Sequence, residues 1–328
     1  MTGYRAAIVG CGMIAGCYEN LSTSEVYSHA KGYLRHRGFA TLGFVDSDPA
    51  RSELLAAKAG GKSFAGIEEL LSGFHPDVVS VCVPDNLHFQ TLEILMRSSC
   101  RPRLIFVEKP VCDTRKQLDM LLDYQERYST PVVVNHSRRF DAMHSRIRSL
   151  LTAGDFGRPV RIHVDYYGGW RHLGVHVVDI LQYFFNAPME ISGATYYCHS
   201  KYPDDPTLNV NATLAGAPVC FAGFPEACYQ ILDINIQCES GQIKLTDFGK
   251  RVEVLGKTVN AEQESVLVAV PGWSNAGMQS PMVKAIEVIA GYLEYGDRGV
   301  LEPYGLEQAS MTMDTIWKGF EIYDARFE

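Results

Sequence analysis

The amino-acid sequence predicts an α/β protein with two domains: an N-terminal doubly wound parallel sheet and a C-terminal α+β domain built on a large, mainly antiparallel sheet. In residues 1–135, nearly continuous apolar runs alternate with amphipathic segments, as in a parallel sheet covered by helices on both faces. From residue 136 onward, apolar runs follow one another with turn residues between them, which is typical of antiparallel strands. We therefore expect domains over residues 1–135 and 136–328.

The first domain is expected to contain five buried strands. Short apolar runs predict these strands at residues 4–10, 40–46, 77–84, 103–110 and 131–137. Amphipathic stretches at 49–60 and 86–99 predict helices between them.

The second domain is expected to start with a helix, a strand and a second helix, at 141–154, 159–167 and about 173–185. Turn signals then separate a series of predicted strands at 191–200, 207–215, 218–224, 229–238, 241–247, 250–256 and 264–270. Two helices at 281–296 and 305–323 close the chain, the first with Pro281 in its first turn.

Composition and charge argue against several classes of protein. The 328 residues are 46% hydrophobic and 21% charged, which suffices for two packed cores and argues against a disordered chain. The net charge of −8 argues against a broad nucleic-acid-binding surface. We find no signal-peptide pattern, no apolar stretch of about 18 residues, and no C-x-x-C pair among the nine cysteines. We therefore expect a cytoplasmic protein with reduced thiols that binds neither membranes nor nucleic acids.

The strongest local motif is the segment GCGMIAG at 10–16, which follows an apolar strand and is expected to open a helix. It fits the dinucleotide fingerprint G-x-G-x-x-G/A of Rossmann domains. Gly10 permits a tight turn, Gly12 lets the backbone approach a pyrophosphate, and the helix N-terminus faces the negative charge. Gly10, Gly12, Met13 and Ile14 are therefore expected to contact a dinucleotide.

Asp46 ends the second predicted strand, where a carboxylate can accept hydrogen bonds from the ribose 2′-hydroxyl of NAD. Because Ser47 follows instead of a basic residue, NAD is expected in preference to NADP. Asp46 lies 30 residues beyond Gly16, against about 20 in the usual fingerprint, and we attribute the excess to an insertion at 19–32. The alternative is that Asp46 only begins a turn or caps a helix ahead of Pro49.

Two further groups of residues follow predicted strands, at the edge where open α/β sheets bind ligands. Pro84 and His88 follow the third strand, and Glu108 and Lys109 end the fourth. We expect all four to line the cofactor site, with the Lys109 ammonium also facing a substrate.

Taken in order, these motifs resemble those of the Gfo/Idh/MocA family, named after glucose-fructose oxidoreductase and inositol dehydrogenase. The resemblance covers nearly the whole chain and rests on GCGMIAG (10–16), VD (45–46), VPDNLH (83–88), EKP (108–110), SRRF (137–140) and GVHVVD (174–179). It implies an N-terminal Rossmann domain that binds NAD or NADP. It also implies a C-terminal α+β domain with a large open sheet, which binds the substrate and forms the interface of a homodimer or homotetramer.

The resemblance further implies a reaction and its catalytic residues. Family members oxidise a hydroxyl of a sugar or cyclitol, or reduce the corresponding ketone. By motif position, Lys109 resembles the lysine that contacts the reacting hydroxyl, and His176 resembles the acid/base histidine. Asp179 resembles a carboxylate one turn later, which we assign to substrate binding. Histidine suits proton transfer near neutral pH, and a cation stabilises a developing alkoxide. We expect a carbohydrate substrate, with nucleotide-linked and acidic sugars as candidates.

One position departs from the family pattern. Many members carry an acidic residue four positions before the acid/base histidine, where this sequence has His172. Either Asp179 or the ligand replaces the missing carboxylate, or the chemistry is altered, or the chain is a cofactor-binding sensor or scaffold with weak turnover. His172, His176 and Asp179 would share a helix face and are also considered as metal ligands, although no metal is expected. An aspartate at position 172 is expected to preserve activity.

Three more residues are assigned to the substrate together with His172. Tyr167 and Arg171 lie close to the expected site in sequence, and Arg139 follows the fifth strand. Core packing is the alternative for Tyr167, and an interdomain ion pair is the alternative for Arg139.

Overall fold

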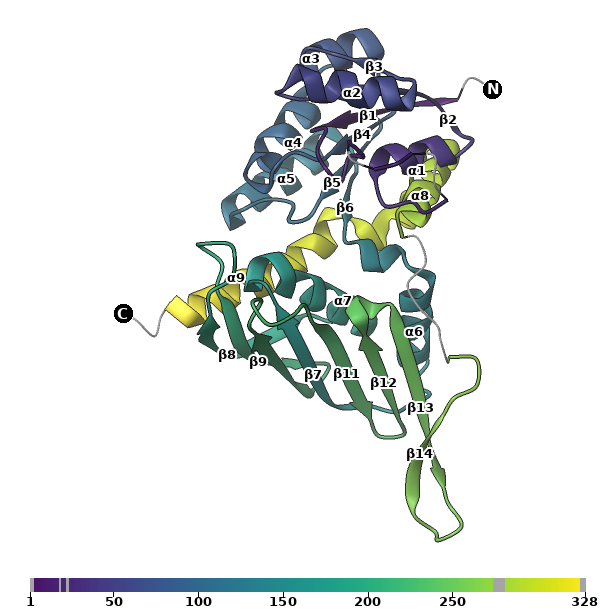
Figure 1. Cartoon of the computed structure of the whole chain (residues 1–328), viewed down its shortest axis with the longest axis vertical. Coiled ribbons are helices and arrows are strands. Elements are labelled where there is room, and N and C mark those ends of the chain that lie inside the picture. The colour runs from purple at the N-terminus through teal and green to yellow at the C-terminus, as the bar shows by residue number, and fades with distance from the viewer. Residues whose placement is uncertain (1–2, 18, 22–23, 274–280, 325–328) are drawn as a thin grey trace. The chain divides into compact units, whose positions relative to one another are not determined.

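The structure of the chain is a computed structural model that describes residues 3–17, 19–21, 24–273 and 281–324 (Figure 1). The chain divides into two compact units. Unit 1 comprises Met1–Phe140 and Ser280–Ser310, and unit 2 comprises Asp141–Gln279 and Met311–Glu328. The expected contiguous division at 135/136 therefore differs from the observed one, because residues 280–310 return to the N-terminal unit.

Unit 1 is built on a six-stranded parallel sheet with the order β3-β2-β1-β4-β5-β6. Its strands are β1 (Tyr4–Val9), β2 (Phe39–Val45), β3 (Lys62–Ser63), β4 (Val78–Val81), β5 (Leu104–Glu108) and β6 (Val132–Asn135). The predicted doubly wound parallel sheet is confirmed. The strand order reverses between β1 and β4, and ligands of such sheets bind at the carboxyl ends of the strands beside this reversal.

Helices connect and cover these strands. They are α1 (His29–Arg35), α2 (Pro49–Ala59), α3 (Ile67–Glu69), η1 (Leu70–Phe74), η2 (Asp85–Leu87), α4 (His88–Arg97), α5 (Arg115–Tyr128), η3 (Ser137–Phe140), α8 (Pro281–Tyr295) and η6 (Arg298–Tyr304). The start of α2 is fixed locally, because the Asp48 side chain accepts a hydrogen bond from the backbone of Ala50 and Pro49 occupies the first turn. The predicted helices at 49–60 and 86–99 correspond to α2 and α4.

Helix α8 explains why unit 1 includes residues far along the chain. Its apolar residues Met282, Ile286 and Ile289 are buried in the same core cluster as residues of α1 and of the sheet. A Cβ atom at Gly32 of α1 would lie 2.9 Å from Ile286 Cγ1, so glycine lets α1 and α8 approach closely. The hydrophobic face of α8 therefore completes the core of unit 1.

Unit 2 contains an eight-stranded sheet with the order β14-β13-β12-β11-β7-β10-β9-β8 (Figure 1). Its strands are β7 (Pro159–Tyr167), β8 (Met189–Cys198), β9 (Thr207–Leu214), β10 (Ala217–Phe224), β11 (Leu232–Cys238), β12 (Gly241–Thr246), β13 (Arg251–Val259) and β14 (Ser265–Ala269). Every neighbouring pair is antiparallel except β7 and β10, which run parallel. The prediction of a large, mainly antiparallel sheet is confirmed.

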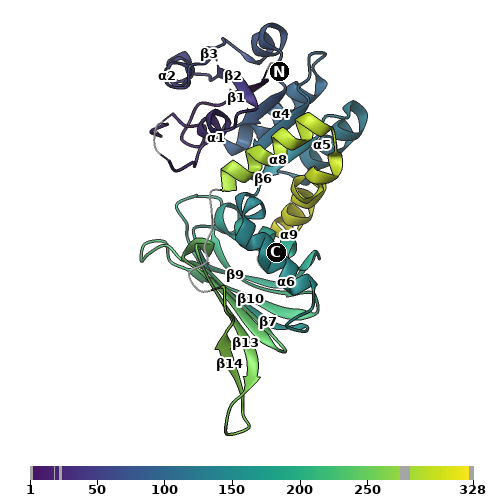
Figure 2. The ribbon, with the colours of Figure 1, turned by 90° about the vertical axis from the view of Figure 1, so that its right-hand side faces the viewer.

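Helical segments cover one face of this sheet (Figure 2). They are α6 (Ala142–Thr152), η4 (Trp170–Gly174), α7 (Val175–Phe185) and α9 (Leu306–Asp324), and a short turn, η5 (Asp247–Gly249), joins β12 to β13. Trp170 is fully buried, contacts Phe221 of the sheet edge to face at 5.2 Å, and donates from Nε1 to the carbonyl of Ile316 in α9. This side chain ties the sheet, η4 and α9 into one core.

In the part of the chain that the structure describes, no helix has both the length and the apolar character that a membrane span requires. The nine cysteines all lie in this part and are free thiols.

Candidate functional site

The two glycines of the N-terminal motif have different surroundings. Gly10 has φ = 90°, and a Cβ atom there would lie 2.6 Å from the backbone of Cys82 and Val83. A Cβ atom at Gly12, by contrast, would meet none of the described residues within 4 Å. The neighbouring Met13 side chain is 78% exposed. Gly10 therefore permits the fold of the turn, and Gly12 leaves open the space that a pyrophosphate needs.

Asp46 lies at the carboxyl end of β2 and contacts the glycine turn. Its carboxylate accepts hydrogen bonds from the backbone N–H of Cys11 at 2.6 Å and of Asp48 at 2.9 Å. Burial, together with the Asp46 charge, raises the pKa of the Cys11 thiol to about 12, so this thiol stays protonated at neutral pH. The structure thus places the predicted carboxylate directly beside the predicted glycine turn.

The helix expected to open at the glycine motif is interrupted, and this expectation was wrong. Residues 13–17 form turns, and α1 begins only at His29. The carbonyls of Ile14 and Ala15 accept hydrogen bonds from the backbone of His29 and Ala30, both at 3.1 Å. The first turn and α1 are therefore joined in space across an inserted loop, which accounts for the long spacing to Asp46.

A buried lysine holds the start of this loop. Lys31 of α1 is fully buried, and its Nζ donates to the Asn20 carbonyl at 2.9 Å and lies 3.2 Å from Glu19 Oε1. The expected insertion at 19–32 is therefore shorter than the sequence suggested, because its last residues belong to α1.

A chain of buried polar groups leads to Glu108 at the end of β5. The Tyr33 hydroxyl and His29 Nδ1 contact Ser80 Oγ at 2.8 and 2.9 Å. His29 Nε2 lies 2.8 Å from Glu108 Oε1, and the Asn135 amide donates to the same oxygen at 2.6 Å. The Glu108 carboxylate is therefore fixed from two sides.

The charge on Glu108 is stabilised against its burial. Burial by itself raises the pKa of Glu108, but the hydrogen bond and charge of His29, the Asn135 amide and the charge of Lys109 together hold it below its ordinary value. Glu108 is thus a carboxylate at neutral pH beside the half-buried Lys109. This arrangement orients the loop that begins with Lys109, which is the residue expected to meet both cofactor and substrate.

His88 does not fit its expected role as a cofactor contact. It is fully buried, and its ring lies between two backbone carbonyls, with Nδ1 2.6 Å from Pro110 O and Nε2 3.0 Å from Val83 O. Its ring therefore joins the loops that follow β4 and β5, while the exposed Pro84 remains where a ligand could contact it.

Arg139 also differs from its expected role as a substrate contact. It is 1% exposed, and its Nη1 donates to the carbonyl of Pro303 at 2.8 Å and to Gln308 Oε1 at 3.2 Å. These contacts tie η3 to residues 303–308 within unit 1, so burial argues against a substrate contact.

In unit 2, the expected catalytic histidine lies on a helical segment that starts at Trp170 and continues through α7. His176, in the first turn of α7, is half-buried. Asp179 is 1% exposed and accepts a hydrogen bond from Thr312 Oγ1 at 3.1 Å. Asp179 therefore joins α7 to α9, and its burial argues against the substrate contact assigned to it.

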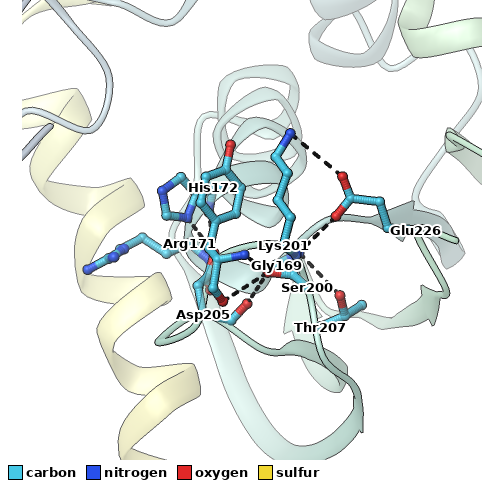
Figure 3. A network of polar contacts seen from close by, with 9 residues as sticks. Gly169, Arg171, His172, Ser200, Lys201, Asp205, Thr207 and Glu226 are labelled. Carbon is cyan, nitrogen blue, oxygen red and sulfur yellow. Dashed lines mark hydrogen bonds and ion pairs between the residues drawn. The ribbon is translucent and has the colours of Figure 1, made fainter. Parts of the chain in front are cut away.

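His172 has a carboxylate partner that the sequence did not reveal. Its Nδ1 lies 2.7 Å from Asp205 Oδ2 (Figure 3). Its ring stacks on that of Tyr202 with 3.5 Å between the centroids. Asp205 belongs to the loop between β8 and β9 and also accepts hydrogen bonds from the backbone of Arg171 and His172. No spacing rule connects positions 172 and 205, so sequence reasoning had no signal for this pair.

The remaining aromatic candidate is a packing residue. Tyr167 is 7% exposed, contacts Phe248 edge to face at 5.9 Å, and has a pKa raised mainly by burial. Core packing, the alternative considered for Tyr167, agrees with this position better than stacking on a sugar does.

The described residues, outside the gaps at 18, 22–23 and 274–280 and the two ends, hold no group of three or more His, Cys, Asp and Glu side chains that could bind a metal. His172 pairs with Asp205, and Asp179 pairs with Thr312. The geometry therefore gives no support to His172, His176 and Asp179 as a set of metal ligands.

Comparison with known proteins agrees with this geometry. Residues 4–136 match the family profile GFO_IDH_MocA, described as "Oxidoreductase family, NAD-binding Rossmann fold". The chain is 25% identical over 204 residues to D-glucoside 3-dehydrogenase of Escherichia coli (strain K12), which covers 56% of this chain and 54% of that protein. It is 29% identical over 152 residues to myo-inositol dehydrogenase Hyg17 of Streptomyces leeuwenhoekii, covering 46% and 42%. The matches thus span about half of the length of these curated relatives.

The fold is shared along the whole chain with solved structures. UDP-N-acetylglucosamine 3-dehydrogenase GnnA from Acidithiobacillus ferrooxidans superposes with a TM-score of 0.78, covers 100% of both chains, and is 16% identical. The chain combines a doubly wound sheet, an open glycine turn and an acidic residue at the end of β2 with a second, α+β unit. These features define the class of NAD(P)-binding Rossmann proteins with a second unit. Within that class, residues 4–136 match the NAD-binding Rossmann model of the GFO_IDH_MocA oxidoreductase family, the family that the sequence motifs resemble.

Proposed function

We propose that this chain is an NAD-dependent oxidoreductase that transfers hydride between the nicotinamide cofactor and a hydroxyl or ketone of a sugar or cyclitol, with nucleotide-linked and acidic sugars as candidates. The observation that carries the proposal lies within unit 1. The open space at Gly12 follows β1, and the Asp46 carboxylate follows β2. Glu108 is the last residue of β5 and Lys109 comes directly after it, so all four lie at the carboxyl edge of one parallel sheet.

The residues of unit 1 suit a dinucleotide. A pyrophosphate would occupy the space beside Gly12, a ribose would lie near Asp46, and Met13, Ile14 and the exposed Pro84 would line the site. Asp46 favours NAD, because its carboxylate would repel a 2′-phosphate. Arg51, in the first turn of α2, is a cation that could contact a 2′-phosphate, but its Nε lies 3.5 Å from Asp48 Oδ2, with which it forms an ion pair.

Each catalytic role is carried over from a matching family position. When bound, the cofactor would accept a hydride from the substrate carbon or return one to it. In the oxidative direction a ring nitrogen of His176 accepts the hydroxyl proton, and the Lys109 ammonium stabilises the alkoxide oxygen until the carbonyl forms. The substrate thereby loses one proton and one hydride and becomes a ketone, and the reverse direction returns both.

A second candidate is a cofactor-binding sensor or scaffold protein with weak turnover. The observation in its favour is the histidine at position 172, where many family members have an acidic residue. The buried Asp205 weakens this candidate, because it brings a carboxylate to the same helical turn.

A panel of sugars, cyclitols and nucleotide sugars, assayed with NAD and with NADP by the absorbance of the reduced cofactor, tests the proposed function. We expect turnover of at least one compound, with NAD used better than NADP. Cofactor binding by calorimetry without any turnover would favour the sensor or scaffold. Better use of NADP would overturn the role given to Asp46.

We further propose that the chain forms a homodimer or homotetramer through the sheet of unit 2. The apolar, tyrosine-containing sequences at 191–200 and 229–238 suggest that the second face of this sheet is not fully solvated. Strand β11 instead carries half-buried polar residues at alternate positions. Exposed apolar side chains occur on the edge strands β8 and β14, and also at Val160 of β7 and Val259 of β13 inside the sheet. Tyr196 and Tyr197 of β8 and Leu267 and Val268 of β14 are 43% to 49% exposed. Exposed apolar edges favour association.

Light scattering at micromolar concentration checks this prediction. We expect a dimer or tetramer, and Leu267→Lys should reduce the assembled fraction because it places a charge on the edge strand β14. Leu34→Lys, a change at a similarly exposed leucine of α1 in unit 1, serves as the matched control. A monomeric native protein would contradict the proposal.

A further inference from the structure

The Asp205 carboxylate is held in one position by its surroundings. Its side chain is fully buried, and it accepts hydrogen bonds from the backbone N–H of Arg171 at 2.8 Å and of His172 at 2.9 Å. Gly169 has φ = 90°, and a Cβ atom at that position would overlap the Asp205 carboxylate. Only glycine fits there, so the chain is shaped to admit this carboxylate.

The loop that carries Asp205 is itself tied down (Figure 3). Ser200 Oγ donates to the carbonyl of Asp205 at 2.7 Å, and the backbone N–H of Gly169 donates to Thr207 Oγ1 at 3.2 Å. Lys201 in the same loop lies 3.6 Å from Glu226. Contacts within the protein therefore hold the loop that carries Asp205.

These contacts also fix the His172 ring. Its Nδ1 lies 2.7 Å from Asp205 Oδ2, its face is parallel to Tyr202 within 4°, and its side chain is 15% exposed. A carboxylate accepts hydrogen bonds and does not donate them, so Nδ1 carries the proton in this contact. In the neutral ring the lone pair then lies on Nε2, the other edge of the imidazole.

His172 and His176 lie on one continuous helical segment. The segment η4 leads directly into α7, and Gly174 at the junction has helical angles, φ = −56° and ψ = −35°. Residues four apart on a helix lie one above the other on the same face. The His172 ring that Asp205 orients therefore extends from the same face of the helical segment as His176, the proposed acid/base residue.

We propose that Asp205 is a positioning residue for the reaction, and that Asp205 and His172 together replace the single carboxylate that many relatives carry at position 172. Asp205 sets the Nδ1–H form of His172, and His172 presents Nε2 as an acceptor for a substrate hydroxyl beside His176. This inference rests on the proposed function. It also changes the expectation for an aspartate at position 172, because two carboxylates would then share one buried space and repel each other.

The test is a cycle of His172→Asp, Asp205→Asn and the double variant, with kcat, KM and the thermal midpoint measured for each. Asp205→Asn in the native background should lower kcat by about 10- to 100-fold, the loss that is typical when the residue that orients a metal-ligating histidine is removed. His172→Asp alone should lower both kcat and the thermal midpoint. Adding Asp205→Asn to His172→Asp should raise both again. Asp204→Asn, which removes an exposed charge from the same loop, should change nothing.

Asp205→Asn should lower kcat when residue 172 is histidine and raise it in the His172→Asp background. This change of sign distinguishes a positioning residue from one that only caps the helix. If Asp205 only caps the backbone of Arg171 and His172, Asp205→Asn would cost the same with histidine or aspartate at 172, and that additivity would overturn the inference. Nitrogen NMR of the histidines, with His172→Gln used for assignment, gives a readout that needs no substrate. We expect a proton on His172 Nδ1 in the native protein and its loss from Nδ1 in Asp205→Asn.

A native His172 with its proton on Nε2 would also overturn the inference. The NMR result and the stability cycle do not depend on turnover. A chain that oxidises no compound in the panel would therefore contradict the proposed function separately from this pairing.

Discussion

Replacing His176 or Lys109 by alanine should each lower kcat by about 10²-fold or more, since general acid/base catalysis commonly contributes about 10²- to 10⁴-fold. Without His176 no positioned base receives the hydroxyl proton, and without Lys109 no ammonium stabilises the alkoxide. Steady-state kinetics with the best compound of the panel measures the effect, with kcat and KM determined separately.

Two matched variants control for general damage. His199→Ala removes an exposed histidine of unit 2, and Lys116→Ala removes an exposed lysine of α5. Both should retain native kcat, and all four variants should keep the native thermal midpoint within a few degrees. A His176→Ala protein with full kcat would show that another group is the base. A loss seen only in KM for Lys109→Ala would assign this lysine to substrate binding alone.

Gly12→Val should abolish measurable binding of NADH while the protein stays folded. A Cβ atom at this position would meet no described residue within 4 Å, so the substitution should cost the fold little, but the valine would fill the space assigned to the pyrophosphate. Calorimetric titration with NADH measures the binding, and thermal unfolding measures the stability.

Gly10→Ala is the variant to compare with Gly12→Val, because a side chain at position 10 should lower the stability of the fold. Its Cβ would lie 2.6 Å from the Cys82 and Val83 backbone, and its φ of 90° is unfavourable for alanine. Strain of this kind costs about 1–3 kcal/mol, so this variant should unfold at a lower temperature than Gly12→Val. Unchanged NADH affinity in Gly12→Val would remove the dinucleotide site from this turn.

Local sequence signals were sufficient for most of the fold. The alternation of buried strands with amphipathic segments predicted the parallel sheet of unit 1, and the run of strands after residue 136 predicted the antiparallel sheet of unit 2. Periodicity and turn residues act over a few positions, so they can be recognised without knowing what packs against them. The glycine turn and Asp46 could also be predicted from the local sequence, because each directly follows the end of a strand.

Contacts between distant segments were decided only by the tertiary structure. Helix α8 returns to unit 1 because its apolar face completes that core, which no pattern within 281–295 can indicate. His88 and Arg139 lie in recognisable motifs, yet both side chains are buried and contact backbone carbonyls of neighbouring segments. These contacts give both residues a structural role.

The pairing of His172 with Asp205 shows the same limit most clearly. The sequence by itself determined that a histidine occupies position 172, four residues before His176 and just ahead of the helix predicted at about 173–185. The carboxylate that orients this histidine comes from a loop 33 residues away. That loop reaches the helix only because β8 and β9 pair in their particular register and Gly169 leaves room for the side chain. Such a contact depends on how the whole sheet is assembled, which local residue preferences do not encode.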